Sequence, residues 1–514
     1  MSSTSENNKR IAKNTLLLYI RMLSMMAISL YTNRIVLDKL GITDFGIYNV
    51  VGGIVVMLGF LSGCMGNSVQ RFLSFELGKN NIEQVNKVFN VSLLVHCVIA
   101  IVILMAMECG GLWYLNTQMN IPSERMDAAN WVFQCSLLTI MFTIIQTPYN
   151  AIIVSKEQMS IYAYISILEV ILKLAVVYVL SIGSFDRLKL YSVLVMLITI
   201  GILIIYRLYC VKQFEEARFR FVTDWKLFKE LISFSGWNML SEIAWTFTGP
   251  GVNIILNSFF GPAINAAKGL AEQVNGAVSR FVTNFQTAVN PQLIKMYAAD
   301  EWDEMKKLLF RSTRFSFYLM FALSLPLILK MDYILHLWLK EVPEYTTIFC
   351  QLTLVCSLAS VLSTLLPKVA WANGNIRNYQ IIVSFVLFLN FPLSYIALKL
   401  GASPYATSFV GIGIQLMLVF VRLVLVGKMI DMSISQFITN VLKPIAFVCI
   451  ISIVIPICLN ILTDNAFVGF IVVSLVSIFS VCMTSYYIGM DAKERMYVRS
   501  AANKLRNRIL IVLK

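Results

Sequence analysis

One stretch of this sequence combines the apolar content of a membrane-spanning helix with a regular series of polar side chains. Between Ile264 and Asn290, polar residues recur three, four or seven positions apart. At about 100° per residue, these positions share one narrow face of a helix. A charge at the bilayer centre costs at least about 2.5–3.5 kcal/mol, so this face cannot contact lipid. We expect it to line a cavity for a polar ligand; its members are Lys268, Glu272, Asn275, Ser279, Gln286 and Asn290.

Arg280 lies about one side chain around the same helix, and no acidic residue lies within one turn of it. Its planar guanidinium matches the oxygens of carboxylates and phosphates, so we expect it to be available for an anionic ligand. Lys268 and Glu272 are four residues apart and can neutralise each other as an ion pair. That spacing leaves a structural role and a binding role open for both.

Two other apolar stretches carry charges inside the expected membrane. Glu169 and Lys173 repeat the four-residue spacing near residue 170, and the same two roles stay open for them. Arg21 lies about two turns inside the first apolar stretch. Its long side chain either faces a cavity or extends back to the cytoplasmic surface.

Glu242 shares one helical face with Trp245, and no cation lies close to it in its own helix. A carboxyl group buried without a partner can take up and release a proton near neutral pH, as ion-coupled transport requires. The alternative is an ion pair with Arg21 or Lys268 from a neighbouring helix. Glu272 and Glu169 are the other acids that we consider for ion coupling.

The charges expected inside the membrane are cationic on balance, since Arg21, Lys173, Lys268 and Arg280 outnumber Glu169, Glu242 and Glu272. An anionic cargo fits that balance. The side chains of Asn275, Gln286 and Trp245 offer hydrogen bonds and a ring face of the kind that sugars need. A lipid-linked phosphate that carries sugars meets both demands.

The composition defines the elements that must position these side chains. The chain has 514 residues, of which 58% are hydrophobic and 14% charged, against about 45–50% and 25% in soluble domains. It is therefore predicted to be an all-α polytopic membrane protein, with about fourteen spans. Lys and Arg concentrate in alternate loops, which places both termini in the cytoplasm. The net charge of +14 then reflects topology and contact with anionic membrane lipid, and no nucleic acid is expected.

Several classes of chemistry are not indicated. The ten cysteines are scattered without a C-x-x-C pair, and His96 and His336 are far apart. No metal, disulfide or redox cofactor is therefore expected. The outer loops are short and poor in acids and bases, and neither a Walker loop nor an H-E-x-x-H motif occurs. We do not expect an enzyme.

The second half of the chain resembles the first at an offset of about 220 residues, so that Leu40-Gly41 corresponds to Phe260-Gly261. Six spans per half give both halves the same orientation, as in transporters that hold substrate between parallel repeats and work by alternating access. We predict an N-terminal lobe at 1–211, a cytoplasmic connection at 212–229 and a C-terminal lobe at 230–427. Residues 428–514 would add two spans and a basic cytoplasmic tail.

Residues 40–48, Leu-Gly-Ile-Thr-Asp-Phe-Gly-Ile-Tyr, resemble the L-G-x-x-x-[YF]-G-x-Y turn of Wzx-type polysaccharide-unit flippases. These belong to the multidrug/oligosaccharidyl-lipid/polysaccharide exporter superfamily, and the six-plus-six layout with two further C-terminal spans is similar as well. The resemblance implies a flippase that moves undecaprenyl-diphosphate-linked oligosaccharide from the cytoplasmic to the periplasmic leaflet of the bacterial inner membrane. It implies a role in surface polysaccharide synthesis, such as lipopolysaccharide, with a downstream polymerase as a partner. It also implies that cations of the first and eighth helices line the cavity, which matches Arg21, Lys268 and Arg280 by position.

The alternative within that superfamily is a proton- or cation-coupled multidrug exporter. Such exporters typically have twelve spans and an acidic cavity suited to cationic drugs. Fourteen spans and a cationic interior favour the flippase. The coupling ion, H⁺ or Na⁺, stays open, and no cofactor is expected.

Overall fold

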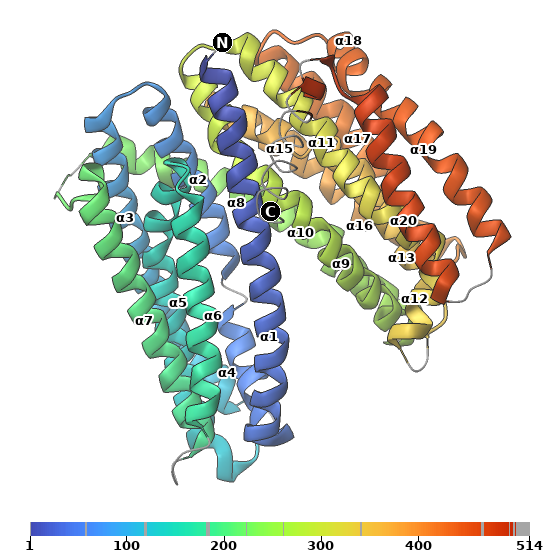
Figure 1. Ribbon diagram of the computed structural model, residues 1–514. Helices are drawn as coiled ribbons and strands as arrows, with labels where there is room; N and C mark the ends of the chain where they lie inside the picture. The colour runs from blue at the N-terminus through green and yellow to red at the C-terminus, as the bar shows by residue number, and fades with distance from the viewer. Residues whose placement is uncertain are drawn as a thin grey trace, which may run out of the picture. The chain divides into compact units, whose positions relative to one another are not determined.

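The computed structural model describes residues 2–56, 59–117, 121–180, 186–220, 222, 224–260, 262–339, 342–463, 467–492, 494–496 and 499. Throughout these residues the regular structure is helical and contains no strand (Figure 1). The predicted all-α class is confirmed. Most of the predicted basic tail, from Lys493 to Lys514, lies outside the described residues.

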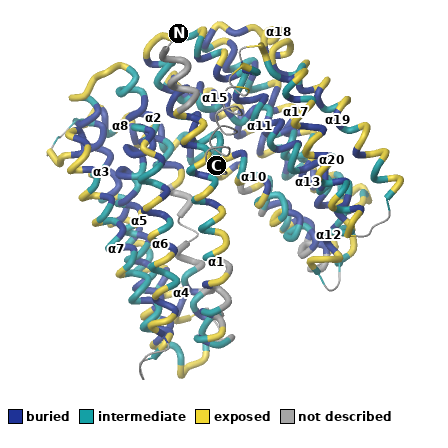
Figure 2. Tube along the Cα trace, in the orientation of Figure 1, coloured by how far each residue is buried: buried dark blue, intermediate teal, exposed yellow. Residues whose placement is uncertain are grey.

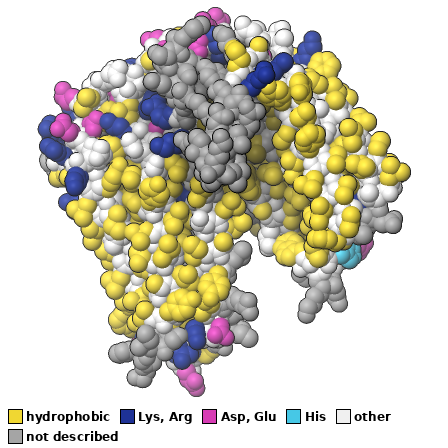
Figure 3. Space-filling view, viewed as in Figure 1, with side chains coloured by type: hydrophobic (Ala, Val, Ile, Leu, Met, Phe, Trp, Pro, Cys, Tyr) yellow, Lys and Arg dark blue, Asp and Glu magenta, His cyan; other side chains and the backbone are white. Residues whose placement is uncertain are grey.

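Eleven helical segments among the described residues are long and apolar enough to cross a membrane. Hydrophobic side chains cover much of the visible helix surface (Figure 3), and large ones such as Ile450, Leu475 and Phe479 are exposed. A soluble protein rarely exposes such extensive apolar surface, whereas lipid accommodates it. The protein is therefore a multi-pass membrane protein. The predicted count of fourteen spans stays a prediction, because α2 (Gly59–Gly78), α8 (Trp225–Thr248) and α10 (Pro262–Ala298) are not among these eleven segments.

Contacts divide the chain into two compact units. Unit 1 comprises Met1–Glu242, Thr287–Glu301 and Trp371–Ile381, and unit 2 comprises Ile243–Gln286, Trp302–Ala370 and Ile382–Lys514. Helices α8, α10, α14 and α15 each contribute residues to both units. The units therefore differ in their boundaries from the lobes predicted at 1–211 and 230–427, which stay a prediction.

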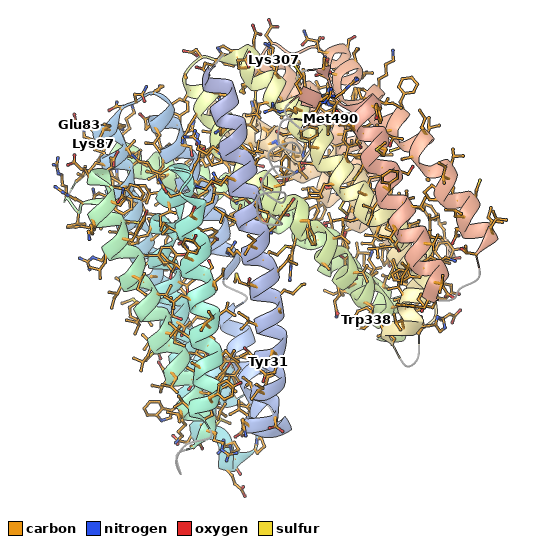
Figure 4. The ribbon with its side chains drawn as sticks, viewed as in Figure 1. Tyr31, Glu83, Lys87, Lys307, Trp338 and Met490 are labelled. Carbon is orange, nitrogen blue, oxygen red and sulfur yellow. The ribbon has the colours of Figure 1, made fainter. Side chains whose placement is uncertain are left out.

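Unit 1 is a helix bundle in which α5 packs against α1, α2, α3 and α7. Its apolar core includes Phe89, Tyr149 and Ile152, and the buried residues follow the faces on which helices meet (Figure 2). Ion pairs between successive turns occur on the exposed faces, for example between Glu83 and Lys87 of α3, 2.8 Å apart (Figure 4). The helices of this bundle are α1 (Ser2–Val56), α2 (Gly59–Gly78), α3 (Ile82–Ala106), α4 (Leu112–Thr117), α5 (Met126–Ser155), α6 (Met159–Val179), α7 (Arg187–Gln213) and α8 (Trp225–Thr248).

In unit 2, α11 packs against α13, α19 and α20, and α13 also packs against α17. Its helices are α9 (Pro250–Phe260), α10 (Pro262–Ala298), α11 (Trp302–Leu329), α12 (Met331–Trp338), α13 (Thr346–Val361), α14 (Leu366–Asn373), α15 (Arg377–Phe388), α16 (Asn390–Lys399), α17 (Ala406–Met429), α18 (Ile434–Phe437), α19 (Lys443–Leu462) and α20 (Phe467–Thr484). Short 3₁₀ or π segments are η1 (Met107–Gly111), η2 (Ser123–Arg125), η3 (Glu215–Ala217), η4 (Ile438–Leu442) and η5 (Ser485–Gly489).

The ends of the helices recur along the chain. The turn from α10 to α11 follows the turn from α2 to α3 by 220 residues, and both contain a left-handed residue, Asn80 (φ 55°) and Asp300 (φ 57°). The turn after α5 contains Glu157 (φ 61°), and the corresponding turn after α14 contains Gly374 (φ 86°). These matched boundaries support the repeat seen in the sequence. The arrangement of the two halves about an axis stays a prediction.

The turn within residues 40–48 is built around a break in α1. Gly41 has a φ of 79°, a left-handed conformation that glycine adopts without strain. Asp44, three residues on, accepts a 2.8 Å hydrogen bond from Nε of Arg125, whose Nη1 donates to Asp186 at 2.7 Å. Asp186 also caps α7 by accepting from the backbone N–H of Leu188. The motif thus ties the end of the first helix to two later turns of unit 1.

Asp186 has a perturbed pKa. Burial acts to raise the pKa of this carboxyl, but hydrogen bonds from Arg125 and from the first N–H groups of α7 favour its charged form. The balance holds the pKa of Asp186 below its usual range.

Candidate functional site

The predicted polar stripe of α10 faces a second polar row within unit 2. Ser357 of α13 donates a 2.7 Å hydrogen bond to Oδ1 of Asn275. Nε2 of Gln286 donates to Oγ1 of Thr364 at 2.7 Å and to Oγ of Ser316 at 3.2 Å. These bonds satisfy polar groups that the apolar membrane interior would otherwise leave unpaired. Asn275 and Gln286 therefore have partners on neighbouring helices, a structural role that the periodicity of α10 alone could not show.

Lys268 belongs to the same packed row. Its Nζ donates to Oγ1 of Thr353 at 3.1 Å and lies 3.5 Å from the carboxylate of Glu272. The Lys268 side chain is 12% exposed, whereas that of Glu272 is 45% exposed. The ammonium also lies 5.6 Å from the ring centre of Phe349. The expected ion pair between residues four positions apart is present. Its lysine is mostly buried, whereas its glutamate is exposed.

Arg280 lies on a different, exposed face of α10. Glu272, Gln273 and Thr283 are also exposed on this side. Among the described residues, no acidic group lies within ion-pairing distance of the Arg280 guanidinium, as its sequence surroundings predicted. If α10 spans the membrane as predicted, a polar exposed face of this kind requires water or a polar ligand. This open face (Glu272, Gln273, Arg280 and Thr283) is the part of α10 best suited to binding.

In unit 1, Arg21 contacts α6. Its Nη2 donates to the hydroxyl of Tyr162 at 3.3 Å, and its guanidinium lies 4.3 Å from the centre of that ring. The Nε of Arg21 is buried and has no acceptor among the described residues. Lys173 and Glu169, on the same helix α6, form an ion pair of 2.7 Å. The structure thus places three of the predicted site residues on two adjoining helices.

Tyr206 of α7 joins this group and was not predicted from the sequence. Its side chain is almost completely buried, and it lies within electrostatic range of Arg21 and Glu169. A tyrosine in an apolar helix is an ordinary core residue by pattern, so the sequence offered no signal for it.

The two predicted residues of α8 are both exposed. Trp245 is 50% exposed and its carbonyl closes the last turn of the helix. Glu242 is exposed rather than buried as predicted, and it interacts with its surroundings, including Cys64 of α2. Arg21 contacts Tyr162, and the alternative pairing of Glu242 with Arg21 or Lys268 stays a prediction. A coupling role for Glu242 stays a prediction.

A buried polar network lies beside Glu242. Gln380 of α15 donates to Oδ1 of Asn238 at 2.6 Å, and Nδ2 of Asn238 donates to Oγ of Ser68 at 3.2 Å. Ser241 of α8 donates to Oε1 of the same glutamine. Asn238 was noticeable as a polar residue in an apolar helix, but its partners lie about 140 and 170 positions away, beyond the reach of local patterns.

Glu157, which the sequence did not single out, has a fully buried carboxylate with two cationic partners and one amide partner. Its two oxygens contact Nε of Arg10 (2.7 Å), Nζ of Lys295 (2.7 Å) and Nε2 of Gln292 (2.9 Å). The backbone carbonyl of Glu157 also accepts from Asn14. This cluster, the Glu157 latch, joins the turn after α5 to the ends of α1 and α10, all within unit 1.

The corresponding turn after α14 is held by Arg71 of α2. Nε and Nη2 of this buried guanidinium donate to the carbonyls of Trp371 (2.6 Å) and Ala372 (2.9 Å). Gly374 has a φ of 86°, which favours glycine, and an added Cβ would also lie 2.5 Å from Nη2 of Arg71. Positions 157 and 374, which both have a positive φ, correspond to each other in the repeat. That repeat is the one signal by which the sequence could have linked the two turns.

The fold is similar to that of known transporters. A point mutant of a MATE protein has a TM-score of 0.71 at 12% identity, covering 83% of this chain and 96% of that one. An outward-facing multidrug resistance MATE transporter of the MOP superfamily has 0.68 at 12%, with the same coverage. A MOP superfamily transporter from Pyrococcus furiosus has 0.68 at 13%, again covering 83% and 96%. At these identities the similarity is one of fold.

Among curated proteins, none matches this sequence. Residues 11–297 match the family described as polysaccharide biosynthesis protein, and this region is more than half of the chain. The chain belongs to the polysaccharide biosynthesis protein family.

Proposed function

We propose that this protein moves undecaprenyl-diphosphate-linked oligosaccharide from the cytoplasmic to the periplasmic leaflet of the bacterial inner membrane by alternating access. The observation that carries the proposal is the open face of α10, on which Arg280 has no acidic partner among the described residues. Family membership supports a cargo from polysaccharide synthesis. In this scheme the termini are cytoplasmic, and a polymerase acts on the delivered units.

The chemistry of the open face suits a diphosphate headgroup. A guanidinium binds phosphate oxygens through two parallel hydrogen bonds, and it keeps its charge at any physiological pH. Gln273 and Thr283, exposed beside Arg280, offer neutral hydrogen bonds to sugar hydroxyls. Lys268, Arg21 and Lys173 add positive charge near the membrane interior, while the lipid tail stays in the bilayer. Glu242 or Glu272 would carry a coupling H⁺ or organise a Na⁺ site.

A multidrug exporter is the second candidate, because the fold is that of a MATE transporter described as a multidrug resistance protein. A cationic drug would require an acidic site, and the open face has one acid beside one arginine. The Pyrococcus furiosus protein is described as having a binding pocket of reverse polarity that suggests a different function. Related folds therefore do not all share one type of cargo, and the charge of this interior favours an anion.

The decisive experiment measures the sidedness of lipid-diphosphate-linked oligosaccharide in cells with and without this gene. We expect the units to accumulate in the cytoplasmic leaflet of the deletion strain and to be cleared when the intact gene is restored. Normal sidedness in a deletion strain that has no redundant flippase would overturn the proposal and favour the drug exporter. Drug susceptibility of the same strains tests that alternative directly.

A further inference from the structure

A cavity of about 630 Å³ in unit 1 has walls from α2, α8 and the turn between α14 and α15. Its lining shares no residue with the open face of α10 and includes Lys229, the last residue of the cytoplasmic connection predicted at 212–229. Its volume is within the range of small-molecule sites, about 300–1,000 Å³. None of the residues considered so far for cargo binding lines it.

Three cations line this cavity: Arg71 of α2, Lys229 of α8 and Arg377 of α15. Among the described residues, none of the three lies within ion-pairing distance of an acid. They differ in this respect from Arg10, Lys156 and Lys295, which all pair with buried carboxylates. Topology explains an excess of cations on the cytoplasmic side, but it does not explain why three unpaired ones surround one cavity.

The orientation of the Arg71 guanidinium is fixed by its hydrogen bonds to the backbone. Its side chain is 6% exposed, and Nε and Nη2 are used by the carbonyls of Trp371 and Ala372. Its Nη1 donates to no acceptor among the described residues. Arg71 therefore keeps donor capacity on the cavity side, and a charged donor of this kind binds phosphate oxygens strongly.

The remaining walls match an anion with an organic substituent. Trp237 lies 5.5 Å from the guanidinium carbon of Arg377, and Phe234 lies 5.5 Å from that of Arg71, each measured from the ring centre. These rings hold the two cations in place and offer apolar surface. Ser233 and Asn375 add hydrogen-bonding groups, and α15 begins at the rim, where the first N–H groups of a helix lack acceptors of their own. Glu230 is the one acid in the lining.

We infer that this cavity is a binding site for a phosphate-bearing anion, in which Arg71, Lys229 and Arg377 contact the phosphate oxygens. Two sources share this chemistry, a soluble diphosphate and the headgroup of a prenyl-diphosphate lipid. The inference does not depend on the proposed flipping of oligosaccharide, because it concerns a separate set of residues and a binding equilibrium.

The test is isothermal titration calorimetry on the purified full chain in detergent, with inorganic diphosphate and with farnesyl diphosphate as probes. All proteins carry Arg280→Ala, so that the proposed cargo site does not contribute. We expect saturable binding to one site and a loss of affinity of about tenfold or more when Lys229 and Arg377 are both changed to Gln. Glu230→Gln should strengthen binding, because it removes the one opposing charge.

Lys226→Gln is the matched control, since Lys226 is an exposed lysine of the same helix that does not line the cavity. It should leave the affinity unchanged. Similar affinities for the two probes would support the site and identify the phosphates as the recognised group, and a much higher affinity for farnesyl diphosphate would support it with a lipid as the source. No saturable binding, or an equal loss in the Lys226→Gln protein, would overturn the inference.

Discussion

Arg280 and Lys268 are both basic residues of α10, yet their surroundings give them different roles. Lys268 is nearly buried against Thr353 and is partly neutralised by Glu272. Arg280 is exposed, and among the described residues no acid lies within ion-pairing distance of it. Removing Lys268 would therefore disturb packing as well as charge, whereas removing Arg280 changes mainly what the open face can bind.

Arg280→Ala should reduce clearance of lipid-linked oligosaccharide from the cytoplasmic leaflet by about tenfold or more, because charge-assisted bonds to phosphate contribute about 1.5–3 kcal/mol. Expression, membrane insertion and thermal stability should stay at the wild-type level. Lys226→Ala, which removes an exposed cation of α8 that does not belong to the open face, is the control and should transport nearly normally. Full transport by the Arg280→Ala protein would remove this residue from the phosphate site.

Asp186 makes the stability of the turn that precedes α7 in unit 1 dependent on pH. Its pKa is lower in the folded than in the unfolded chain, where it is about 3.9, so its contribution is present above that value and is lost as the pH falls through the folded-state pKa. Asp186→Asn keeps a capping side chain for α7 but removes the charge. Wild type should therefore unfold at a higher temperature than this variant at pH 7, and the difference should shrink below about pH 4. A constant difference across that range would show that the charge of Asp186 is not responsible.

Helix α10 illustrates what a single sequence can and cannot predict about an element. Periodicity correctly identified a helix with a continuous polar stripe from Lys268 to Gln286. It could not distinguish a stripe that lines a cavity from one that meets another polar helix, because the partners Ser357 and Thr364 lie about 80 residues away. Arg280 was placed correctly beside the stripe, since that relation depends only on helix geometry.

The contacts of the two turns that hold unit 1 together could not be predicted from the sequence either, because their partners are distant in the chain. In the sequence, Glu157 is a charge in a loop and Arg71 a charge near the end of a helix. Glu157 pairs with Lys295 of α10 and Arg71 with the carbonyl of Trp371 of α14, both far along the chain. The helices and their repeated ends could be predicted because they follow from local hydrophobic pattern and turn residues. The contacts between helices could not.

The turn at Gly374 allows a test at this scale. Gly374→Ala places a Cβ 2.5 Å from Nη2 of Arg71 at a φ of 86°, so it should destabilise the protein by at least about 1–2 kcal/mol. Thermal unfolding in detergent measures the effect as a lower midpoint. Gly276→Ala is the control, since an added methyl group there meets nothing within 4 Å and alanine favours a helix. Equal midpoints for the two variants would show that the contact of Arg71 with this turn is not tight.

At the scale of the whole molecule, the predicted topology places the turns at Glu157 and Gly374 on the same cytoplasmic side. The prediction can be checked with a protein whose ten native cysteines are replaced and in which Asn375→Cys adds one. Asn375 is exposed, so a membrane-impermeant maleimide should label it in inverted vesicles and not in intact cells. A cysteine in place of Tyr114, exposed in α4, should show the opposite pattern. Labelling of the position 375 cysteine from outside would reverse the assigned orientation.

The recurrence of helix ends about 220 residues apart also has an evolutionary meaning. Matching boundaries with divergent residues, such as Asn80 and Asp300 or Glu157 and Gly374, are the trace that a tandem gene duplication leaves. An ancestor of half this length would have worked as a pair of identical subunits, and each of its mutations would have appeared twice. Fusion into one gene would release the two copies from that constraint. One copy could then acquire an acid at its turn, as at Glu157, while the other acquired a glycine, as at Gly374. In this way the two halves of a symmetric ancestor could come to differ in sequence and function.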